Sequence, residues 1–117
     1  MGIQSIFEDI LLITLPAQPQ NGDELDVVNK MFGDDVDRDV VVDLAKVEML
    51  TSGTICGLMI LDRLLRGAGR QLVLFNVPSP IKQVFVRTGL LTVFEFASDE
   101  LAALQQVRSR RTSWVQT

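Results

Sequence analysis

The segment Val40-Val41-Val42-Asp43-Leu44 is followed by Leu50-Thr51-Ser52-Gly53 and then by a helix-patterned run that begins at Thr54. The first segment is β-branched and apolar on both faces, which is typical of a central strand in a parallel sheet. A short loop then leads to two adjacent hydroxyl side chains, Thr51 and Ser52, at a helix start. Free backbone N–H groups and the positive end of the helix dipole favour a phosphate there. The pattern therefore predicts a buried strand followed by a candidate phosphorylation site.

The simpler interpretation of Ser52 is an ordinary N-cap. A serine in that position stabilises a helix by about 1 kcal/mol, because its side-chain oxygen accepts a backbone hydrogen bond. From spacing alone, the structural role and the phosphorylation site both remain open.

Strands and helices alternate on both sides of this segment. Residues 3–7 and 10–15 read as two short strands, which predicts an N-terminal hairpin. A loop then precedes a short helix, in which Leu25, Val28 and Phe32 keep helical spacing.

The elements after the central strand follow the same alternation. The main helix is expected over residues 53–68, and a second buried strand over residues 72–75. Ser79-Pro80 begins the next helix, since proline suits the first helical position. Gly89 is expected to end that helix.

A last short strand is expected over residues 93–96, before a closing helix that Ser98 caps. The alternation predicts a single α/β domain with a mainly parallel, mixed β-sheet of about five strands, an N-terminal hairpin and about four helices. A length of 117 residues is enough for one domain with a real core. We place this domain over residues 1–110 and assign residues 111–117 to a short basic C-terminal tail.

Charge and aromatic content argue against nucleic acid as a partner. The net charge is −4, and the aromatic residues are six Phe, one Trp and no Tyr. Nucleic-acid binding depends on clustered Lys and Arg and on aromatic side chains that stack on bases. Eight acidic residues instead lie between Asp23 and Asp43.

The sequence also lacks the residues of common enzymes. Histidine is absent, which removes the usual general base and the commonest neutral metal ligand. Neither a Gly-x-Gly-x-x-Gly string nor a phosphate-binding loop motif occurs. We therefore expect no catalysis, no metal and no cofactor. The single cysteine, Cys56, is expected to be a buried small hydrophobe.

The cysteine content and the hydropathy pattern indicate a location. A lone cysteine fits a reducing cytoplasm. The first residues show no basic start followed by an apolar signal core. The longest apolar runs, residues 10–15 and 55–61, fall short of the roughly 20 residues that span a bilayer. We expect a cytoplasmic protein without direct membrane insertion.

Two segments together resemble a known family. The first is Asp43-Leu44-Ala45-Lys46-Val47 with the loop into Leu50-Thr51-Ser52-Gly53, and the second is Pro80-Ile81-Lys82-Gln83-Val84-Phe85-Val86-Arg87-Thr88-Gly89-Leu90. At this spacing, and with Val93-Phe94-Glu95-Phe96 before an acidic helix start, the chain resembles the STAS domain of bacterial anti-sigma factor antagonists. The resemblance covers residues 10–104.

This resemblance implies a partner-switching function. In that family the domain binds an anti-sigma factor, usually a serine kinase of the GHKL ATPase type, and so frees a sigma factor. The kinase phosphorylates a Ser or Thr at the start of the helix after the third strand, which ends the binding, and a PP2C-type phosphatase restores it. Matching the motif places this hydroxyl on Ser52, with Thr51 as the neighbouring candidate.

Two positions depart from the family pattern. Leu50 stands where the family commonly has an Asp, and residues 16–22 replace a Gly-Glu-Leu-Asp-like loop. The first departure concerns kinase recognition at Ser52, and the second concerns the usual partner surface.

We expect the partner-binding surface to consist of Leu50, Thr51, Ser52, Gly53 and Thr54. Nearby apolar side chains would either widen this surface or face the sheet, namely those of Leu50, Ile55 and Met59. Two other functions stay open: a scaffold subunit of a larger signalling complex, and a regulatory subunit of a membrane ABC transporter. A homodimer is a further option.

Overall fold

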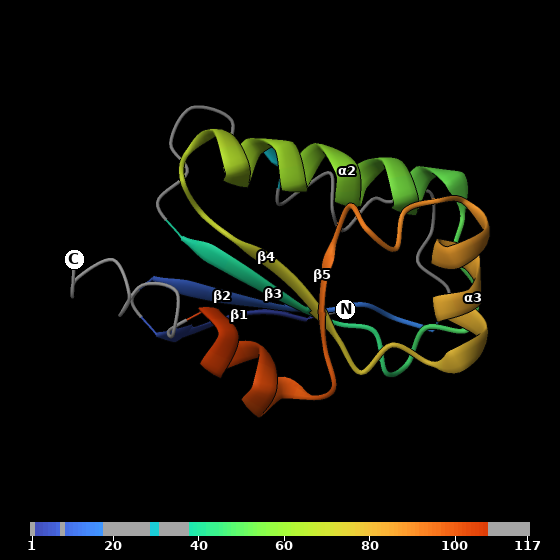
Figure 1. Ribbon diagram of the computed structural model, residues 1–117. Helices are drawn as coiled ribbons and strands as arrows, with labels where there is room; N and C mark the ends of the chain where they lie inside the picture. Colours follow the sequence, from blue (N-terminus) through green and yellow to red (C-terminus); the bar gives the residue numbers. More distant parts are fainter. Residues whose placement is uncertain (1, 8, 18–28, 31–37, 108–117) are drawn as a thin grey trace.

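The computed structural model describes residues 2–7, 9–17, 29–30 and 38–107. Within these residues the sheet has five strands in the order β1-β2-β3-β4-β5 (Figure 1). They are β1 (Gly2–Phe7), β2 (Ile10–Thr14), β3 (Asp39–Asp43), β4 (Leu72–Phe75) and β5 (Glu95–Ala97). β1 is antiparallel to β2, and every other neighbouring pair is parallel. The predicted hairpin and the mixed, mainly parallel sheet are confirmed.

The central strand, β3, is buried on both faces. Its valines are 0% exposed. Val40 and Val42 join one apolar cluster, whereas Val41 joins a second cluster that also holds Ala103 and Val107. Successive side chains of a strand point to opposite faces, so an all-apolar centre needs a covering layer on each side.

Helices supply these covering layers. α2 (Ser52–Gly67) lies over one face of the sheet, and the helix at residues 100–107 lies over the other (Figure 1). α2 contributes Leu58, Leu61 and Leu65 to the first cluster. Fully burying a leucine side chain stabilises a fold by about 1.5–3 kcal/mol. Leucines at this spacing therefore fix which side of α2 faces the sheet.

α3 (Ser79–Arg87) lies at the end of the sheet where β3 and β4 finish (Figure 1). The turn after it contains Gly89 at φ +75°, a conformation that glycine adopts without steric cost. The ring of Phe85 meets Phe94 and Phe96 edge to face, at centroid distances of 5.8 and 5.5 Å. These contacts join α3 to β5, and the predicted end of the helix at Gly89 is confirmed.

The last strand begins later than predicted. We expected it over residues 93–96, but β5 is Glu95–Ala97. The backbone nitrogens of Val93 and Phe94 donate hydrogen bonds to Leu90 O, at 3.0 and 3.4 Å. These two residues are therefore held in a turn and do not pair with β4.

Two predictions about single side chains are wrong. Ser98 does not cap the closing helix. Asp99 does, because its Oδ1 accepts a hydrogen bond from Ala102 N at 2.8 Å. Cys56 is exposed instead of buried, since the leucines of α2 turn the opposite side of that helix toward the core.

Three helices are seen within the described residues, namely α2, α3 and residues 100–107. The fourth expected helix, around residues 25–32, lies outside them except for Asn29 and Lys30, which are helical. The predicted tail also lies outside the described residues. No helix that the structure describes is long and apolar enough to cross a membrane.

Candidate functional site

The loop before α2 is anchored by the carboxylate that ends β3. Asp43 Oδ1 accepts hydrogen bonds from Ala45 N at 2.9 Å and from Asn76 Nδ2 at 3.4 Å. Leu44 N also donates to Phe75 O at 3.1 Å. The ends of β3 and β4 are thus tied together, and this holds the start of α2 in place.

The N-cap of α2 is Thr51 and not Ser52, which corrects the simpler interpretation of Ser52. Thr51 has an extended backbone (φ −92°, ψ 161°), and its Oγ1 accepts a hydrogen bond from Thr54 N at 3.1 Å. Its Oγ1 also lies 3.0 Å from Thr54 Oγ1. Ile55 N donates to Thr51 O at 3.1 Å and closes the first turn. The Thr51 hydroxyl therefore caps the helix and also contacts the Thr54 hydroxyl.

Ser52 is the first helical residue, and its environment differs from that of Thr51. Ser52 is exposed, whereas Thr51 is half-buried. Among the residues that the structure describes, none forms a hydrogen bond with the Ser52 hydroxyl. Of the two adjacent hydroxyl groups, the one on Ser52 is the more accessible to another protein.

The other expected surface residues differ in exposure. Leu50 is half-buried and packs against the first apolar cluster, and Gly53 is half-buried. Thr54 is 0% exposed, so its side chain is buried at the helix start. Its place in the contact surface stays a prediction.

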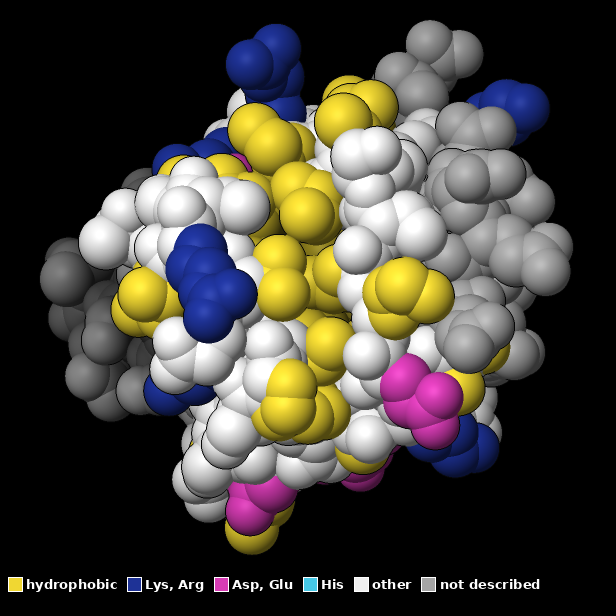
Figure 2. Space-filling model, turned by 90° about the vertical axis from the view of Figure 1, so that its right-hand side faces the viewer, with side chains coloured by type: hydrophobic (Ala, Val, Ile, Leu, Met, Phe, Trp, Pro, Cys, Tyr) yellow, Lys and Arg dark blue, Asp and Glu magenta, His cyan; other side chains and the backbone are white. Residues whose placement is uncertain are grey.

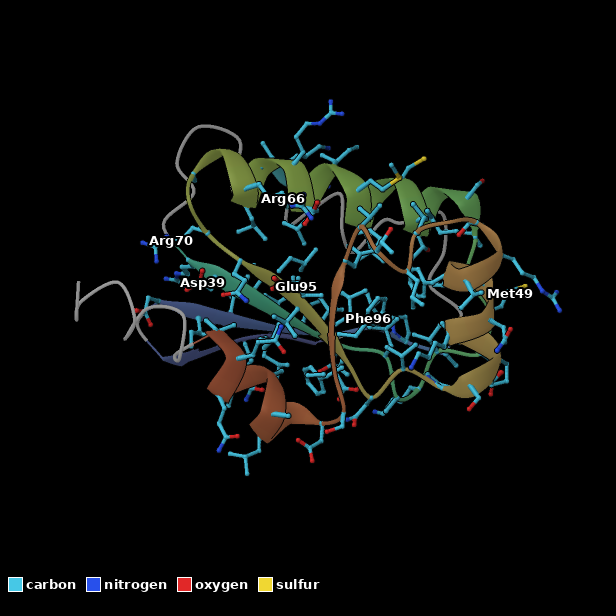
Figure 3. All side chains as sticks on the ribbon, in the orientation of Figure 1. Asp39, Met49, Arg66, Arg70, Glu95 and Phe96 are labelled. Carbon is cyan, nitrogen blue, oxygen red and sulfur yellow. The ribbon has the colours of Figure 1, made fainter. Side chains whose placement is uncertain are left out.

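Exposed apolar side chains extend well beyond these residues. Figure 2 looks onto the side of the molecule that carries α3 and the start of α2, and hydrophobic side chains form a continuous band across it. Met49, just before the loop ends, lies beside α3 (Figure 3). We define the apolar band as five exposed large hydrophobic residues of α2, α3 and the loops next to them: Met49 (53% exposed), Met59 (43%), Ile60 (52%), Val86 (46%) and Leu91 (36%).

Sequence reasoning found only part of the apolar band. Met59 was considered, but Met49, Ile60, Val86 and Leu91 were missed. The signal was available for Ile60, because it lies on the side of α2 opposite Leu58 and Leu61. The first half of the helix has no charged residue, so the sequence did not distinguish its exposed side from its buried side.

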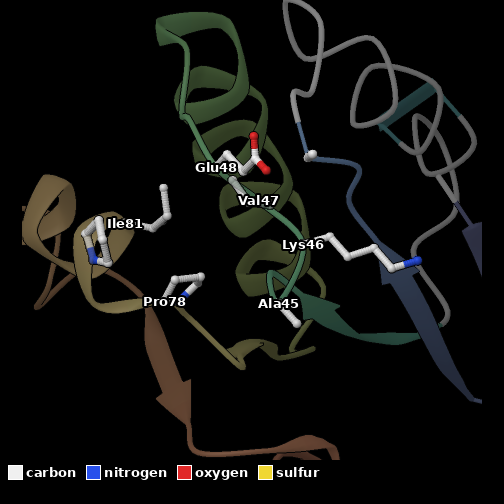
Figure 4. Close-up of a pocket in the computed structure, with 8 residues that line it drawn as sticks. Ala45, Lys46, Val47, Glu48, Pro78 and Ile81 are labelled. Carbon is white, nitrogen blue, oxygen red and sulfur yellow. The ribbon is translucent and has the colours of Figure 1, made fainter.

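A groove of about 650 Å³ adjoins the band, between the loop and the start of α3 (Figure 4). Its walls are mostly aliphatic, with one lysine and one glutamate. The lining residues are Ala17, Ala45, Lys46, Val47, Glu48, Pro78, Pro80 and Ile81. Glu48 N donates to Ala17 O at 2.8 Å, which fixes one edge of the groove.

A polar network occupies the opposite end of α2, around a second cavity of about 370 Å³. Arg66 Nε lies 3.0 Å from Asp62 Oδ2, and Gln71 Nε2 donates to Glu95 Oε2 at 2.6 Å. Burial raises the pKa of the Asp62 carboxyl, while Arg66 opposes the increase and Glu95 adds to it.

This network joins elements of the fold. Asp39 Oδ1 accepts from Gln71 N at 2.9 Å, and Arg70 Nη1 lies 3.8 Å from Asp39 Oδ2. Figure 3 shows Asp39 and Arg70 together at the end of the sheet away from Met49. Across the described residues, no cluster of three or more His, Cys, Asp or Glu side chains has the arrangement of a metal site.

The fold agrees with a family assignment. The family model for the STAS domain matches residues 5–103, and the chain belongs to the STAS domain family. No curated protein matches the sequence significantly.

Solved structures share this fold at low sequence identity. A serine-to-glutamate variant of RsbS from Moorella thermoacetica has a TM-score of 0.79 and 15% identity, over 95% of this chain and 97% of that one. A chain of the stressosome, described as a signal integration and transduction hub, has a TM-score of 0.72 and 16% identity, over 94% and 98%. The anti-sigma factor antagonist SpoIIAA in its unphosphorylated form has a TM-score of 0.72 and 12% identity, over 92% and 96%.

Proposed function

We propose that this STAS domain is an anti-sigma factor antagonist. In this proposal it binds an anti-sigma factor of the serine kinase type and so releases a sigma factor, and phosphorylation of Ser52 ends the binding. A PP2C-type phosphatase would restore it. The main support is the exposed hydroxyl of Ser52 at the first position of α2, beside a threonine that is already used as the cap. SpoIIAA, which has the same fold, is an anti-sigma factor antagonist.

The folded domain should tolerate a phosphate at Ser52. A phosphoserine carries about −1.5 to −2 charges at neutral pH. At the start of a helix the dipole favours such a charge by roughly 0.3–1 kcal/mol. Because Ser52 is exposed, the group would remain in water, so modification should leave the fold intact.

A docked partner would not tolerate the same phosphate. A charge that becomes buried in an interface without a partner costs on the order of several kcal/mol. Each 1.4 kcal/mol changes an affinity by about tenfold. Phosphorylation should therefore reduce binding by orders of magnitude while the domain stays folded.

The test is phosphorylation in vitro. The purified chain is incubated with ATP and a panel of GHKL-type anti-sigma kinases, and the peptide that contains Thr51 and Ser52 is analysed by mass spectrometry. We expect one phosphate on Ser52, its loss in Ser52→Ala and its retention in Thr51→Ser. Binding of the kinase to the modified and unmodified chains is then compared by calorimetry. Equal affinities, or modification at Thr51 alone, would contradict the proposal.

A second candidate function is a scaffold subunit of a larger signalling complex. The similarity to a stressosome chain over almost its whole length favours this alternative. Sedimentation velocity separates the two, because a switch module should be a monomer or dimer and a scaffold should form large particles. Nothing in the described residues favours the transporter subunit.

A further inference from the structure

The exposed side of α2 forms a continuous stripe that starts at the candidate phosphorylation site. Ser52, Cys56, Met59, Ile60 and Arg63 are all exposed. Ser52, Cys56, Met59 and Arg63 follow one another at intervals of three or four residues, and Ile60 lies four residues after Cys56 and three before Arg63, so all five lie on one side of the helix. At a rise of about 1.5 Å per residue, the stripe extends roughly 12 Å from Ser52 to Ile60. A partner element that contacts Ile60 along this helix would also pass over Ser52.

The apolar part of this surface continues beyond α2. Val86 lies on α3, Met49 lies in the loop before α2, and Leu91 lies in the turn after α3. Figure 2 shows hydrophobic side chains in a continuous band on this side of the molecule. The band is therefore built from four segments, namely the loop before α2, α2 itself, α3 and the turn after α3.

Cations flank this band. Arg63 follows Met59 by four residues and Ile60 by three, so all three share one side of α2. On α3, Lys82 precedes Val86 by four residues, which places it on the same side as Val86. Both cations are exposed.

The local charge is opposite to that of the whole chain. In residues 44–94, which the structure describes without a gap, Arg66 and Arg70 have carboxylate partners. No ion pair is found there for the exposed cations Lys46, Arg63, Lys82 and Arg87, and Glu48 is the one exposed carboxylate of this segment. The net charge of the protein is −4. Exposed cations, Arg63 on α2 and Lys82 on α3 among them, thus form a positively charged border beside the apolar band of an acidic protein.

This combination restricts what can cover the band. A second copy would bring its own Arg63 and Lys82 against the same cations, and like charges across an interface oppose association. An anionic lipid surface would attract the border but would repel the strongly acidic remainder of the chain. A partner protein that carries apolar residues between carboxylates satisfies both parts of the surface.

We propose that the apolar band binds an amphipathic helix of a partner protein, in which Asp or Glu residues border the apolar face. This inference rests on the proposed function, because it assigns the helix to the partner that is released when Ser52 is phosphorylated. An amphipathic helix binds another protein through its own apolar residues at intervals of three and four. The exposed residues of α2 have the same spacing. A phosphate on Ser52 would then repel the acidic border of the helix, in addition to being buried by it.

The experiment compares two synthetic helical peptides of about 18 residues that share one Leu face. Glu borders this face in the first peptide, and Lys borders it in the second. Binding to the full, unphosphorylated chain is measured by fluorescence anisotropy. We expect the Glu peptide to bind at least about tenfold more tightly. That preference should weaken when salt rises from about 50 to about 300 mM, because salt screens exposed charges.

Variants locate the interaction. Arg63→Glu combined with Lys82→Glu should remove the preference for the Glu peptide. Ile60→Asp should weaken the binding of both peptides, and it should leave the protein folded because Ile60 is exposed. Leu101→Ala is the matched control, since Leu101 is 65% exposed on the helix that covers the other face of the sheet. Circular dichroism confirms that each variant is folded.

Several outcomes would overturn the proposal. They are equal binding of both peptides, binding of neither, and an equal loss in Leu101→Ala. Binding to phosphatidylglycerol vesicles through Arg63 and Lys82, without a preference for the Glu peptide, would assign the band to a membrane surface. A dimer that Ile60→Asp dissociates would assign it to a second copy.

The experiments distinguish failure of the docking inference from failure of the proposed switch. If the Glu peptide binds at the band but no kinase modifies Ser52, the docking inference stands and the switch fails. If phosphorylation of Ser52 releases an anti-sigma kinase but the peptides bind equally, the switch stands and the acidic-helix inference fails.

Discussion

Thr51 Oγ1 lies 3.1 Å from the backbone nitrogen of Thr54, so the threonine next to Ser52 is the residue that caps α2. Two adjacent hydroxyl side chains therefore have different environments. The one on Thr51 is held by the helix, and the one on Ser52 faces solvent. This difference can be measured as a difference in stability.

Thr51→Ala should lower the free energy of unfolding by about 1 kcal/mol, because the cap of α2 is lost. Ser52→Ala should change it by less than about 0.5 kcal/mol, as expected of an exposed position. Urea denaturation of both variants measures the two values. Thr51→Ser, which keeps a capping oxygen, should recover most of the loss. Equal effects of the two alanine substitutions would show that the cap is misassigned.

Leu50→Asp should weaken binding of an anti-sigma partner at least about tenfold. Leu50 borders Ser52 and is only half-buried, and an aspartate in a docked interface would be desolvated without a partner. Calorimetry with a purified anti-sigma kinase measures the affinity. Leu101→Asp, on the opposite helix, is the control and should bind normally. Unchanged affinity in a folded Leu50→Asp chain would remove Leu50 from the partner surface.

Two glycine substitutions should have opposite effects. Gly89→Ala should destabilise the fold by about 1–2 kcal/mol, because Gly89 has φ +75° and an L-residue is strained there. Gly67→Ala should stabilise it by about 0.4–1 kcal/mol, since Gly67 ends α2 in a conformation that alanine adopts. A Cβ at either position would meet no atom within 4 Å. The pair therefore tests backbone conformation alone, and thermal denaturation showing the same sign for both would refute it.

The stability contribution of Asp62 should depend on pH. Burial raises the pKa of Asp62 in the folded chain, so between about pH 4 and that raised value the folded state binds more protons than the unfolded state. Its contribution to stability therefore falls as the pH rises through this window. Asp62→Asn removes the titration but keeps an oxygen acceptor for Arg66.

We expect the free energy of unfolding of Asp62→Asn, minus that of the natural chain, to increase from about pH 4 to pH 7. Urea denaturation at several pH values measures this difference. Arg66 opposes the rise in the pKa of Asp62, so an Arg66→Ala background should extend the window to higher pH. A difference that stays constant or decreases with pH would contradict the assignment.

The main elements could be predicted because their apolar patterns are unambiguous. Val40, Val41 and Val42 are β-branched and apolar on both faces, and only a strand between two covering layers accommodates them. The hairpin followed from two short apolar runs. The end of α3 followed from Gly89, whose backbone conformation is rarely available to other residues.

The finer details could not be predicted, since neighbouring residues competed for the same role. Thr51 and Ser52 both carry a hydroxyl that could cap α2. Likewise, Ser98 and Asp99 both carry a side-chain oxygen that could cap the closing helix. In each pair, the residue at which the helix begins determines which side chain is the cap. The exposure of Cys56 depended on the rotation of α2 about its axis. That rotation is set by leucines later in the helix.

Finally, β3 is closed between two apolar layers, and this has a consequence for how a modification is communicated. A tightly packed sheet does not deform continuously, so a phosphate at Ser52 would be recognised at the place where it is attached. The domain would signal by whether its surface is occupied, without allosteric rearrangement. Amide chemical shifts in β3 and β4 should then be the same in the phosphorylated and unphosphorylated chains. Changes should be confined to the first turn of α2 and its immediate neighbours.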